Sequence, residues 1–285
     1  MSITSRLSRR HALTGFGLLT LGTPALAHLA RASVPAVPRT PNDSTLLDVF
    51  VRMRSSPDGA TVRWIYSGVL VGKLEGEVAV PLTRIEGMSR TRAIARSDGA
   101  WDWHLDEAGY YCDLASGQVL EKWLNPLTGH QVAPVHYRSA QRLIFRDDAV
   151  LPAAEMPPGA KFRGEITQLA SIAGILALTE DLYVSIDARA ATDTQPARPR
   201  RLAASLATFT TTLAQLAQPR DQWVDCQFTY TTLNSFVGWL GMSDMAGIQN
   251  MRLVGVKCRV DDDAAVPTWL RERLTKEHPD LLNPL

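Results

Sequence analysis

Apolar and polar residues alternate with a period of two along most of the chain. The alternation is clearest in five stretches, residues 62–67, 78–82, 182–187, 224–230 and 254–260. Such a pattern is typical of β-strands that place one face against a core. Further strands are expected near residues 141–147, 162–170 and 173–187. In the last alternating stretch, Val254, Val256 and Cys258 share the predicted core face.

Helical spacing of apolar residues occurs near the two ends of the predicted domain. An N-terminal helix is expected after a cap at Asp43 or Ser44, and turn-forming residues follow it. A C-terminal helix begins near Pro267 and ends before Pro279. The segment 201–218 is ambiguous, because its apolar spacing suits a helix whereas its β-branched threonines disfavour one.

Two similar turn sequences, DLASG and NPLTG, lie twelve residues apart. Each opens with Asp or Asn, which can bond its own backbone, and each closes with Gly, which readily takes positive φ. Asp113 opens the first turn, and the second contains Asn125, Pro126, Thr128 and Gly129. Two such hairpin loops predict three consecutive antiparallel strands, a meander, between residues 106 and 137.

About ten strands and two short flanking helices fit a single mainly β domain over residues 44–285. We expect the antiparallel meander to close into a lipocalin-like barrel or a strongly curved sheet. Several strands carry apolar residues on both faces, as at Trp64 and Ile65. One face would then enclose the interior, and helices or loops would cover the other.

The first 32 residues are typical of an export signal. Arg9 and Arg10 precede a weakly apolar stretch, and small residues offer cleavage sites after Ala27 or Ala32. The stretch is shorter than the roughly 20 apolar residues of a membrane helix, so no stable membrane span is expected in the mature protein. We predict a twin-arginine signal at 1–32, recognised by the twin-arginine export machinery, and a periplasmic mature protein. A plain secretory leader or an uncleaved anchor is the alternative.

Charge and composition exclude several classes of protein. The chain has 285 residues, of which 45% are hydrophobic and 21% charged, as in a soluble globular protein. Its 30 basic and 29 acidic residues give a net charge of +1, and cleavage after Ala32 leaves 26 basic residues and a net charge of −3. This balance argues against nucleic acid as a partner. A Pro-rich linker is expected at residues 33–43, before the domain.

Three cysteines, Cys112, Cys226 and Cys258, remain after cleavage. In an oxidising compartment an odd number leaves at least one free thiol or an intermolecular bridge. Cys226 and Cys258 lie in two strands of matching pattern and could form a disulfide. The alternative is that all three are small core residues.

The turn region carries motifs that resemble those of a known family. These are Tyr111-x-Asp113, Gly117-x-Val119-Leu120, Trp123-x-Asn125-Pro126-x-Thr128-Gly129, Val132 and His136. The later motifs Gly238-Trp239-Leu240-Gly241-Met242 and Pro267-x-Trp269-Leu270 resemble the second half of the same family. It is a group of exported bacterial proteins catalogued as domain of unknown function 1838, and the resemblance spans residues 46–285. The resemblance implies the β architecture and the export route, and it implies no reaction.

The motif residues His136 and Asp113 are candidates for general acid–base catalysis. His104, Asp113 and His136 could meet across neighbouring strands, but their spacing has no metal-binding signature. The sequence contains no G-x-S-x-G turn and no Gly-rich phosphate loop. We therefore predict no metal and no cofactor. Further places for acid–base chemistry are Glu180, Asp181, Tyr110, Tyr111 and Tyr137.

Seven tryptophans are many for a chain that is only 7% aromatic. In a β domain most of them are expected in the core, but large rings with a polar edge also line small-molecule pockets. The candidates for ligand contact are Trp103, Tyr111, Trp123 and Trp239.

Three functions fit these observations. The first is a periplasmic protein that binds a small, largely apolar molecule in an interior cavity of at least about 300 Å³. The second is a cofactor-independent enzyme, such as an isomerase, cyclase or hydrolase, that acts in the same cavity. The third is an interaction module that uses an exposed edge strand.

Overall fold

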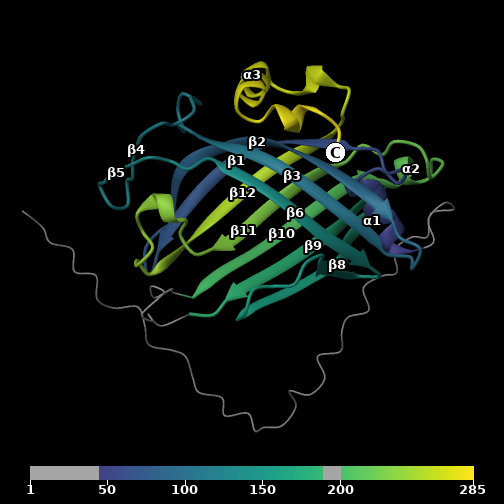
Figure 1. Cartoon of the computed structure of the whole chain (residues 1–285), viewed down its shortest axis with the longest axis horizontal. Helices are drawn as coiled ribbons and strands as arrows, with labels where there is room; N and C mark the ends of the chain where they lie inside the picture. Colours follow the sequence, from purple (N-terminus) through teal and green to yellow (C-terminus); the bar gives the residue numbers. More distant parts are fainter. Residues whose placement is uncertain (1–44, 189–199) are drawn as a thin grey trace, which may run out of the picture. The chain divides into compact units, whose positions relative to one another are not determined.

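A closed antiparallel β-barrel forms the body of the protein, which confirms the predicted fold class (Figure 1). The computed structural model describes residues 45–188 and 200–285, and the predicted signal and linker lie outside them. Around the barrel the strands follow the order β1 (Val62–Leu74), β12 (Gly247–Arg259), β11 (Gln227–Asn234), β10 (Arg201–Thr212), β9 (Ile175–Ile186), β8 (Ala160–Ile172), β7 (Ala149–Pro152), β6 (Tyr137–Arg146), β3 (Trp101–Cys112) and β2 (Val80–Ala95).

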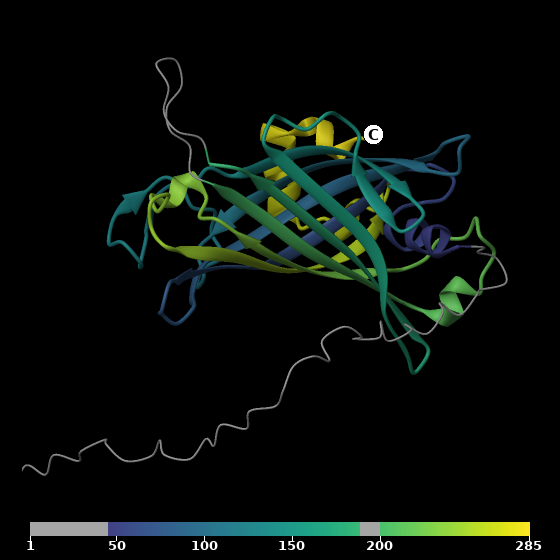
Figure 2. The same cartoon turned by 90° about the horizontal axis from the view of Figure 1, so that it is seen from below.

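The pairing of neighbouring strands decides which residues share the interior. Trp64 on β1 pairs with Ser89 on β2, and Ser89 pairs with Glu107 on β3. Because side chains alternate between the two faces of a strand, these three residues point into the barrel together. The strands run obliquely across the barrel, so inward residues of successive strands form layers (Figure 2).

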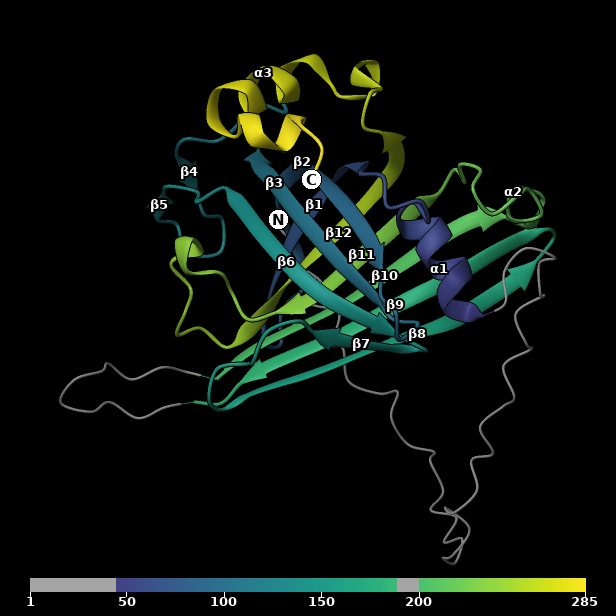
Figure 3. The same ribbon diagram turned by 45° about the vertical axis from the view of Figure 1, so that its right-hand side comes forward.

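Helix α1 (Leu46–Arg54) closes one end of the barrel (Figure 3). Its cap is Thr45, whose Oγ1 accepts a hydrogen bond from the backbone N of Asp48 at 3.1 Å. The predicted caps, Asp43 and Ser44, are therefore one or two residues too early. Four further helical segments of the described chain are short: α2 (Leu213–Leu216), η1 (Gly238–Leu240), η2 (Asp263–Ala265) and η3 (Pro279–Leu282).

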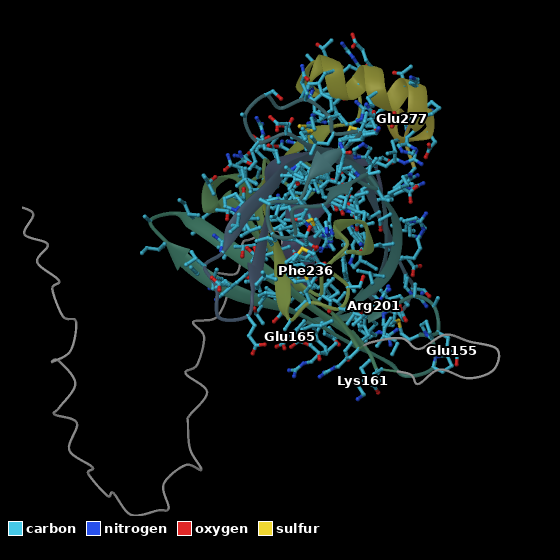
Figure 4. The ribbon with its side chains drawn as sticks, turned by 90° about the vertical axis from the view of Figure 1, so that its left-hand side faces the viewer. Glu155, Lys161, Glu165, Arg201, Phe236 and Glu277 are labelled. Atoms are coloured by element: carbon cyan, nitrogen blue, oxygen red, sulfur yellow. The ribbon has the colours of Figure 1, made fainter. Side chains whose placement is uncertain are left out.

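Apolar clusters fill both ends of the barrel. The cluster beside α1 includes Phe50, Trp64, Trp103, Phe145 and Phe209. The cluster at the opposite end includes Tyr66, Tyr111, Phe236, Leu240 and Met242. In Figure 4, which looks into this second end, Phe236 lies within the ring of strands. The barrel is therefore closed by side chains at both ends.

Helix α3 (Thr268–Glu277) covers part of the outer surface of the barrel (Figures 1 and 3). Leu270 and Leu274 pack in one cluster with Met88 of β2. The helix ends before Pro279, as predicted. This packing confirms that strands with apolar residues on both faces have one face covered by a helix.

Both predicted turns form. Asp113 and Asn125 each accept a backbone hydrogen bond through Oδ1 from within their own turn. The closing residues Gly117 and Gly129 have φ angles of 70° and 69°. These left-handed angles favour glycine, as the sequence indicated.

The meander predicted between the turns is wrong in its extent. Over residues 113–136 the chain leaves the barrel wall, and its strands shrink to β4 (Trp123–Leu124) and β5 (Gln131–Val132). These two form their own sheet, so the barrel neighbour of β3 on this side is β6. Pro126 and Pro134 interrupt the segment, and because proline has no N–H it cannot extend a ladder of hydrogen bonds.

The predicted strand β12 forms, but its two faces are the reverse of those expected. Val254 and Val256 point outward and are 62% and 45% exposed, whereas Leu253 and Lys257 are buried. Alternation identifies the residues that share a face, and in β12 the valine face is the outer one. The ambiguous segment 201–218 divides into β10 followed by α2.

The disulfide considered between Cys226 and Cys258 does not form. Cys226 belongs to the interior cluster beside α1, whereas Cys258 lies on the same outward face of β12 as Val256. The two thiols therefore point to opposite faces of the wall. All three cysteines are free and buried.

Asn125 connects the second turn to η1. It is fully buried, and its Nδ2 donates to the backbone O of Leu240 at 2.9 Å. We expect Asn125→Ala to lower the free energy of unfolding by about 1–3 kcal/mol, because a buried carbonyl loses its partner. Urea unfolding measures the loss. Asp113→Ala, in the exposed turn, is the matched control and should have the smaller effect; equal losses would contradict the assignment.

Candidate functional site

The barrel interior contains a cavity of about 140 Å³. The apolar part of its wall includes Trp64, Trp103, Leu105, Phe209 and Phe228, and the polar part includes Arg54, Tyr66, Glu107, Tyr137, Glu180 and Tyr230. The volume is below the roughly 300 Å³ expected from the sequence, and it is close to the roughly 150 Å³ of a cavity that holds benzene. The closed barrel therefore has room for a molecule with one ring.

A buried ion pair lies on one side of the cavity. Arg54, the last residue of α1, pairs with Glu180 of β9, and their side chains are 9% and 3% exposed. The guanidinium carbon also lies 3.9 Å from the centroid of the Trp103 ring. Burial lowers the pKa of Arg54 to about 9, so the group is still charged at neutral pH. Helix α1 thus supplies a positive charge to the barrel interior.

Glu107 is the second carboxyl group in the cavity wall, and tyrosines surround it. Its side chain hydrogen-bonds with the hydroxyl of Tyr137, and the hydroxyl of Tyr66 lies beside it. Burial raises its pKa to about 7, against the opposing effects of the Tyr137 hydrogen bond and the charge of Arg54. Because Glu180 already balances Arg54, an ionised Glu107 adds an unpaired negative charge. The carboxyl group therefore changes protonation near neutral pH.

Two glycines make room for the hydroxyl of Tyr66. Gly87 on β2 and Gly109 on β3 face each other in register. A Cβ atom at these two positions would lie 2.6 and 2.9 Å from the Tyr66 hydroxyl oxygen. That hydroxyl also donates to the backbone O of Ala108 at 3.2 Å. The paired glycines therefore fix the position of this hydroxyl in the cavity wall.

Strand β6 forms the least supported part of the cavity wall. It pairs with β7 only over Leu143–Arg146, whereas its pairing with β3 continues to Tyr137. Tyr137 and Gln141, in the half of β6 without a β7 partner, both line the cavity. Local opening requires fewer backbone hydrogen bonds to break here than in the continuous ladders elsewhere. This half of β6 is therefore the part of the cavity wall that local opening would expose most readily.

The structure separates the four aromatic residues predicted to contact a ligand. Trp103 lines the cavity. Tyr111 and Trp123 instead pack on Trp239, with ring centroids 4.8 and 5.9 Å from it. These three rings lie among the residues that close the barrel end opposite α1.

The two residues predicted for acid–base catalysis lie outside the residues that line the cavity. His136 precedes β6, and its Nδ1 accepts a hydrogen bond from the backbone N of Tyr111 at 3.3 Å. Burial lowers the pKa of His136. Asp113 lies in the exposed turn, where hydrogen bonds from Ser116 lower the pKa of its carboxyl group. Each side chain is engaged in local backbone structure.

Sequence reasoning missed Glu107 and Arg54. A signal for Glu107 was present, because it follows Trp101, Trp103 and Leu105 at the same spacing of two and so shares their inward face. An acidic residue that shares one face of a strand with apolar residues is a candidate for a functional group inside the protein. Arg54 lies at the end of the N-terminal helix, and its role depends on where that helix packs.

No group of three or more His, Cys, Asp or Glu side chains is placed to hold a metal ion within residues 45–188 and 200–285. Over those same ranges, no helix combines the length and the apolar character needed to cross a membrane.

Comparison with known protein families gives a match to most of the chain. The family described as "Protein of unknown function (DUF1838)" matches residues 59–284. The chain belongs to this family. In this DUF1838 protein the matched region contains every barrel strand, and it begins after Arg54.

Two other comparisons add no functional information on the DUF1838 protein. A search of curated proteins finds no match. Among solved structures, the crystal structure of MucB in complex with MucA(peri) aligns over 80% of this chain and 94% of that chain. The sequence identity is 10% and the TM-score is 0.12, which is too low to indicate a shared fold.

The buried carboxyl group of Glu107 makes stability depend on pH. Its pKa is 4.5 in a freely solvated chain and about 7 in the barrel, so the folded protein holds the proton more tightly. The protonated Glu107 makes its full contribution to the free energy of unfolding below pH 4.5, and this contribution is lost as the pH rises to about 7. The loss amounts to about 3 kcal/mol.

We expect Glu107→Gln to abolish this part of the pH dependence. Near pH 4.5 the variant and the wild type should be similar in stability, and at about pH 8 the variant should be more stable by about 3 kcal/mol. Urea unfolding at a series of pH values measures the difference. Subtracting the two curves removes other titrating groups, such as Lys257, whose pKa burial lowers to about 7. Parallel curves would show that Glu107 titrates normally.

Proposed function

We propose that this DUF1838 protein binds a small, largely apolar molecule with one polar group inside its barrel. The supporting observation is the cavity of about 140 Å³, in which aromatic rings meet the partly buried Glu107 and Tyr137 and the buried Tyr66. Buried polar groups lose their hydration, which opposes folding. Proteins retain such groups with perturbed pKa values mainly at functional sites.

The wall of the cavity defines the chemistry of the ligand. Trp64, Trp103 and Phe209 offer apolar surfaces to a ring. Glu107 and the tyrosine hydroxyls can donate or accept hydrogen bonds, so the polar end of the ligand is a hydroxyl or a carbonyl group. A second charge would need a partner, and Arg54 is already paired with Glu180.

Phenol is a suitable first probe, because it combines one ring with one hydroxyl. Calorimetric titration measures binding directly. Thermal unfolding measures it a second way, because a ligand that binds only the folded state raises the free energy of unfolding, by about 2.7 kcal/mol when phenol is at about 100 times its Kd. We expect wild type to bind phenol. Ala207→Leu should lose binding, because residue 207 lines the cavity. Ala140→Leu is the matched control, because Ala140 is exposed and pairs with Asp106 on the outer face.

Retained binding in Ala207→Leu would place the phenol site elsewhere, and absence of binding to wild type would overturn the proposed function. Both variants require a check of folding by circular dichroism, because an added side chain in a packed interior destabilises by about 1–3 kcal/mol.

We further propose that the protein is exported through the twin-arginine machinery and acts in the periplasm. Support comes from Arg9 and Arg10 before the weakly apolar stretch and from the cleavage sites after Ala27 and Ala32. Replacing both arginines by lysine should retain the full-length precursor in the cytoplasm. Cell fractionation and the mass of the N-terminal peptide measure the outcome. Normal export of the double variant would contradict this route.

A further inference from the structure

Resting on the binding site proposed above, we infer that Glu107 is a catalytic acid–base that moves a proton within a small unsaturated ketone bound in the barrel. The inference stands on the juxtaposition of a carboxyl group, tyrosine hydroxyls and aromatic walls around one cavity. It goes beyond binding, because it assigns a reaction class and the residue that performs the reaction.

The residues that line the cavity restrict the chemistry. No His and no Cys is among the described residues of its wall. Imidazole and thiol groups, which commonly form or activate a nucleophile, are therefore not available there. The cavity does hold a carboxyl group that changes protonation near neutral pH. A proton shift within one substrate needs such a group and no co-reactant.

The reaction is the conversion of a β,γ-unsaturated ketone into its α,β-unsaturated isomer. A carboxylate oxygen of Glu107 takes a proton from the carbon between the carbonyl group and the double bond. The C–H electron pair moves into the carbonyl system and forms a dienolate. The protonated carboxyl group then returns the proton to the γ carbon. One C–H bond breaks and one forms, so atoms and electrons balance.

Groups that stabilise the dienolate oxygen are already beside Glu107. The Tyr137 hydroxyl hydrogen-bonds with the carboxylate. When the carboxylate takes up the substrate proton it loses its charge, and the Tyr137 hydroxyl can donate to the dienolate oxygen instead. Arg54, although paired with Glu180, lies in the same interior, and its charge acts on Glu107. Donors and charges held in place in an apolar site are the usual means of stabilising an oxyanion.

Glu107 titrates near neutral pH and lines the cavity, whereas Lys257, which titrates in the same range, is not among the lining residues. The groups that act on it are Arg54 on α1, Tyr66 on β1, Tyr137 and Arg138 on β6 and Tyr230 on β11. Burial raises the pKa of each of these tyrosines, and Arg54 stays charged below its pKa of about 9. The value of kcat/KM should therefore rise with pH and level off above about pH 7.

Cyclohex-3-en-1-one is the probe for the reaction, because its single ring matches a cavity of about 140 Å³ and its conjugated product absorbs ultraviolet light. We expect the full chain to form cyclohex-2-en-1-one. Glu107→Gln should lower kcat by about 10²–10⁴-fold. Glu165→Gln is the matched control, because Glu165 is on the outer face with a side chain that is 45% exposed, and its rate should equal that of wild type.

Tyr137→Phe and Gly109→Ala keep the carboxyl group and test its surroundings. Loss of the Tyr137 hydroxyl should lower kcat by about 10²-fold with little change in KM. A methyl group at Gly109 should displace the Tyr66 hydroxyl, which lies 2.9 Å from the added Cβ position. We expect this displacement to shift the midpoint of the pH profile, a readout that a purely structural change would not move.

Cyclohexanone, which binds without isomerising, separates this inference from the binding proposal. If cyclohexanone binds and wild type leaves cyclohex-3-en-1-one unchanged, the catalytic inference is overturned and the binding function stands. Equal rates in wild type and Glu107→Gln would likewise overturn it. If neither cyclohexanone nor phenol binds, the binding function fails, and the catalytic inference fails with it.

Discussion

Replacing Arg54 by methionine is expected to lower the free energy of unfolding by about 3–5 kcal/mol. The guanidinium is the partner of Glu180, whose side chain is only 3% exposed. Without it, Glu180 is left as an uncompensated charge inside the barrel. The contact between the guanidinium and the Trp103 ring, at 3.9 Å from its centroid, is lost as well.

Two controls separate the loss of the pair from the loss of a side chain. Arg54→Met combined with Glu180→Leu should recover most of the stability, because apolar side chains of similar volume then replace both charges. Arg96→Met removes an exposed ion pair with Asp102, 3.0 Å between Nη1 and Oδ1, and should have little effect. Urea unfolding at pH 7 measures all three variants. A loss no larger than that of Arg96→Met would show that Glu180 does not depend on Arg54.

The barrel could be predicted from the sequence because it depends on a local property. Alternating residues such as Val62, Trp64 and Tyr66 report a strand with one apolar face, whatever the strand pairs with. The turn residues at 113–117 and 125–129 likewise act through their own backbone. These features survive in the structure because no distant contact is needed to produce them.

The extent of pairing and the choice of inner face could not be predicted in the same way. Val254 and Val256 share a face, but the alternation is equally consistent with that face pointing outward. The sequence between residues 113 and 136 contains good turns, yet Pro126 and Pro134 limit the strands that join them. Each of these outcomes depends on what lies opposite the segment in the fold.

The site was the part least accessible to sequence reasoning. Its central groups come from α1, β3 and β9, and the Arg54–Glu180 pair joins residues 126 positions apart. Local motifs directed attention to His136 and Asp113, which serve backbone structure at the barrel end. Glu107 carries no motif, and what distinguishes it is its place in the cavity wall, which is a property of the closed barrel.

Phe50→Ala should destabilise the protein by about 3–5 kcal/mol, because a large ring is removed from a packed interior. Phe50 of α1 is fully buried. Its ring contacts those of Phe145 and Phe209 edge to face, with centroids 5.4 and 5.5 Å away. Phe162→Ala is the matched control, because Phe162 is only partly buried at the edge of the same cluster, and it should have the smaller effect.

Phe50 also positions the site, because α1 carries Arg54 into the cavity one helical turn later. If the helix docks as a unit, Phe50→Ala and Arg54→Met weaken the same contact, and their combined loss should be less than the sum of the two single losses. A double-mutant cycle by urea unfolding measures this coupling. Additive losses would show that the guanidinium reaches Glu180 without help from the packing of Phe50, and that α1 does not act as one structural unit.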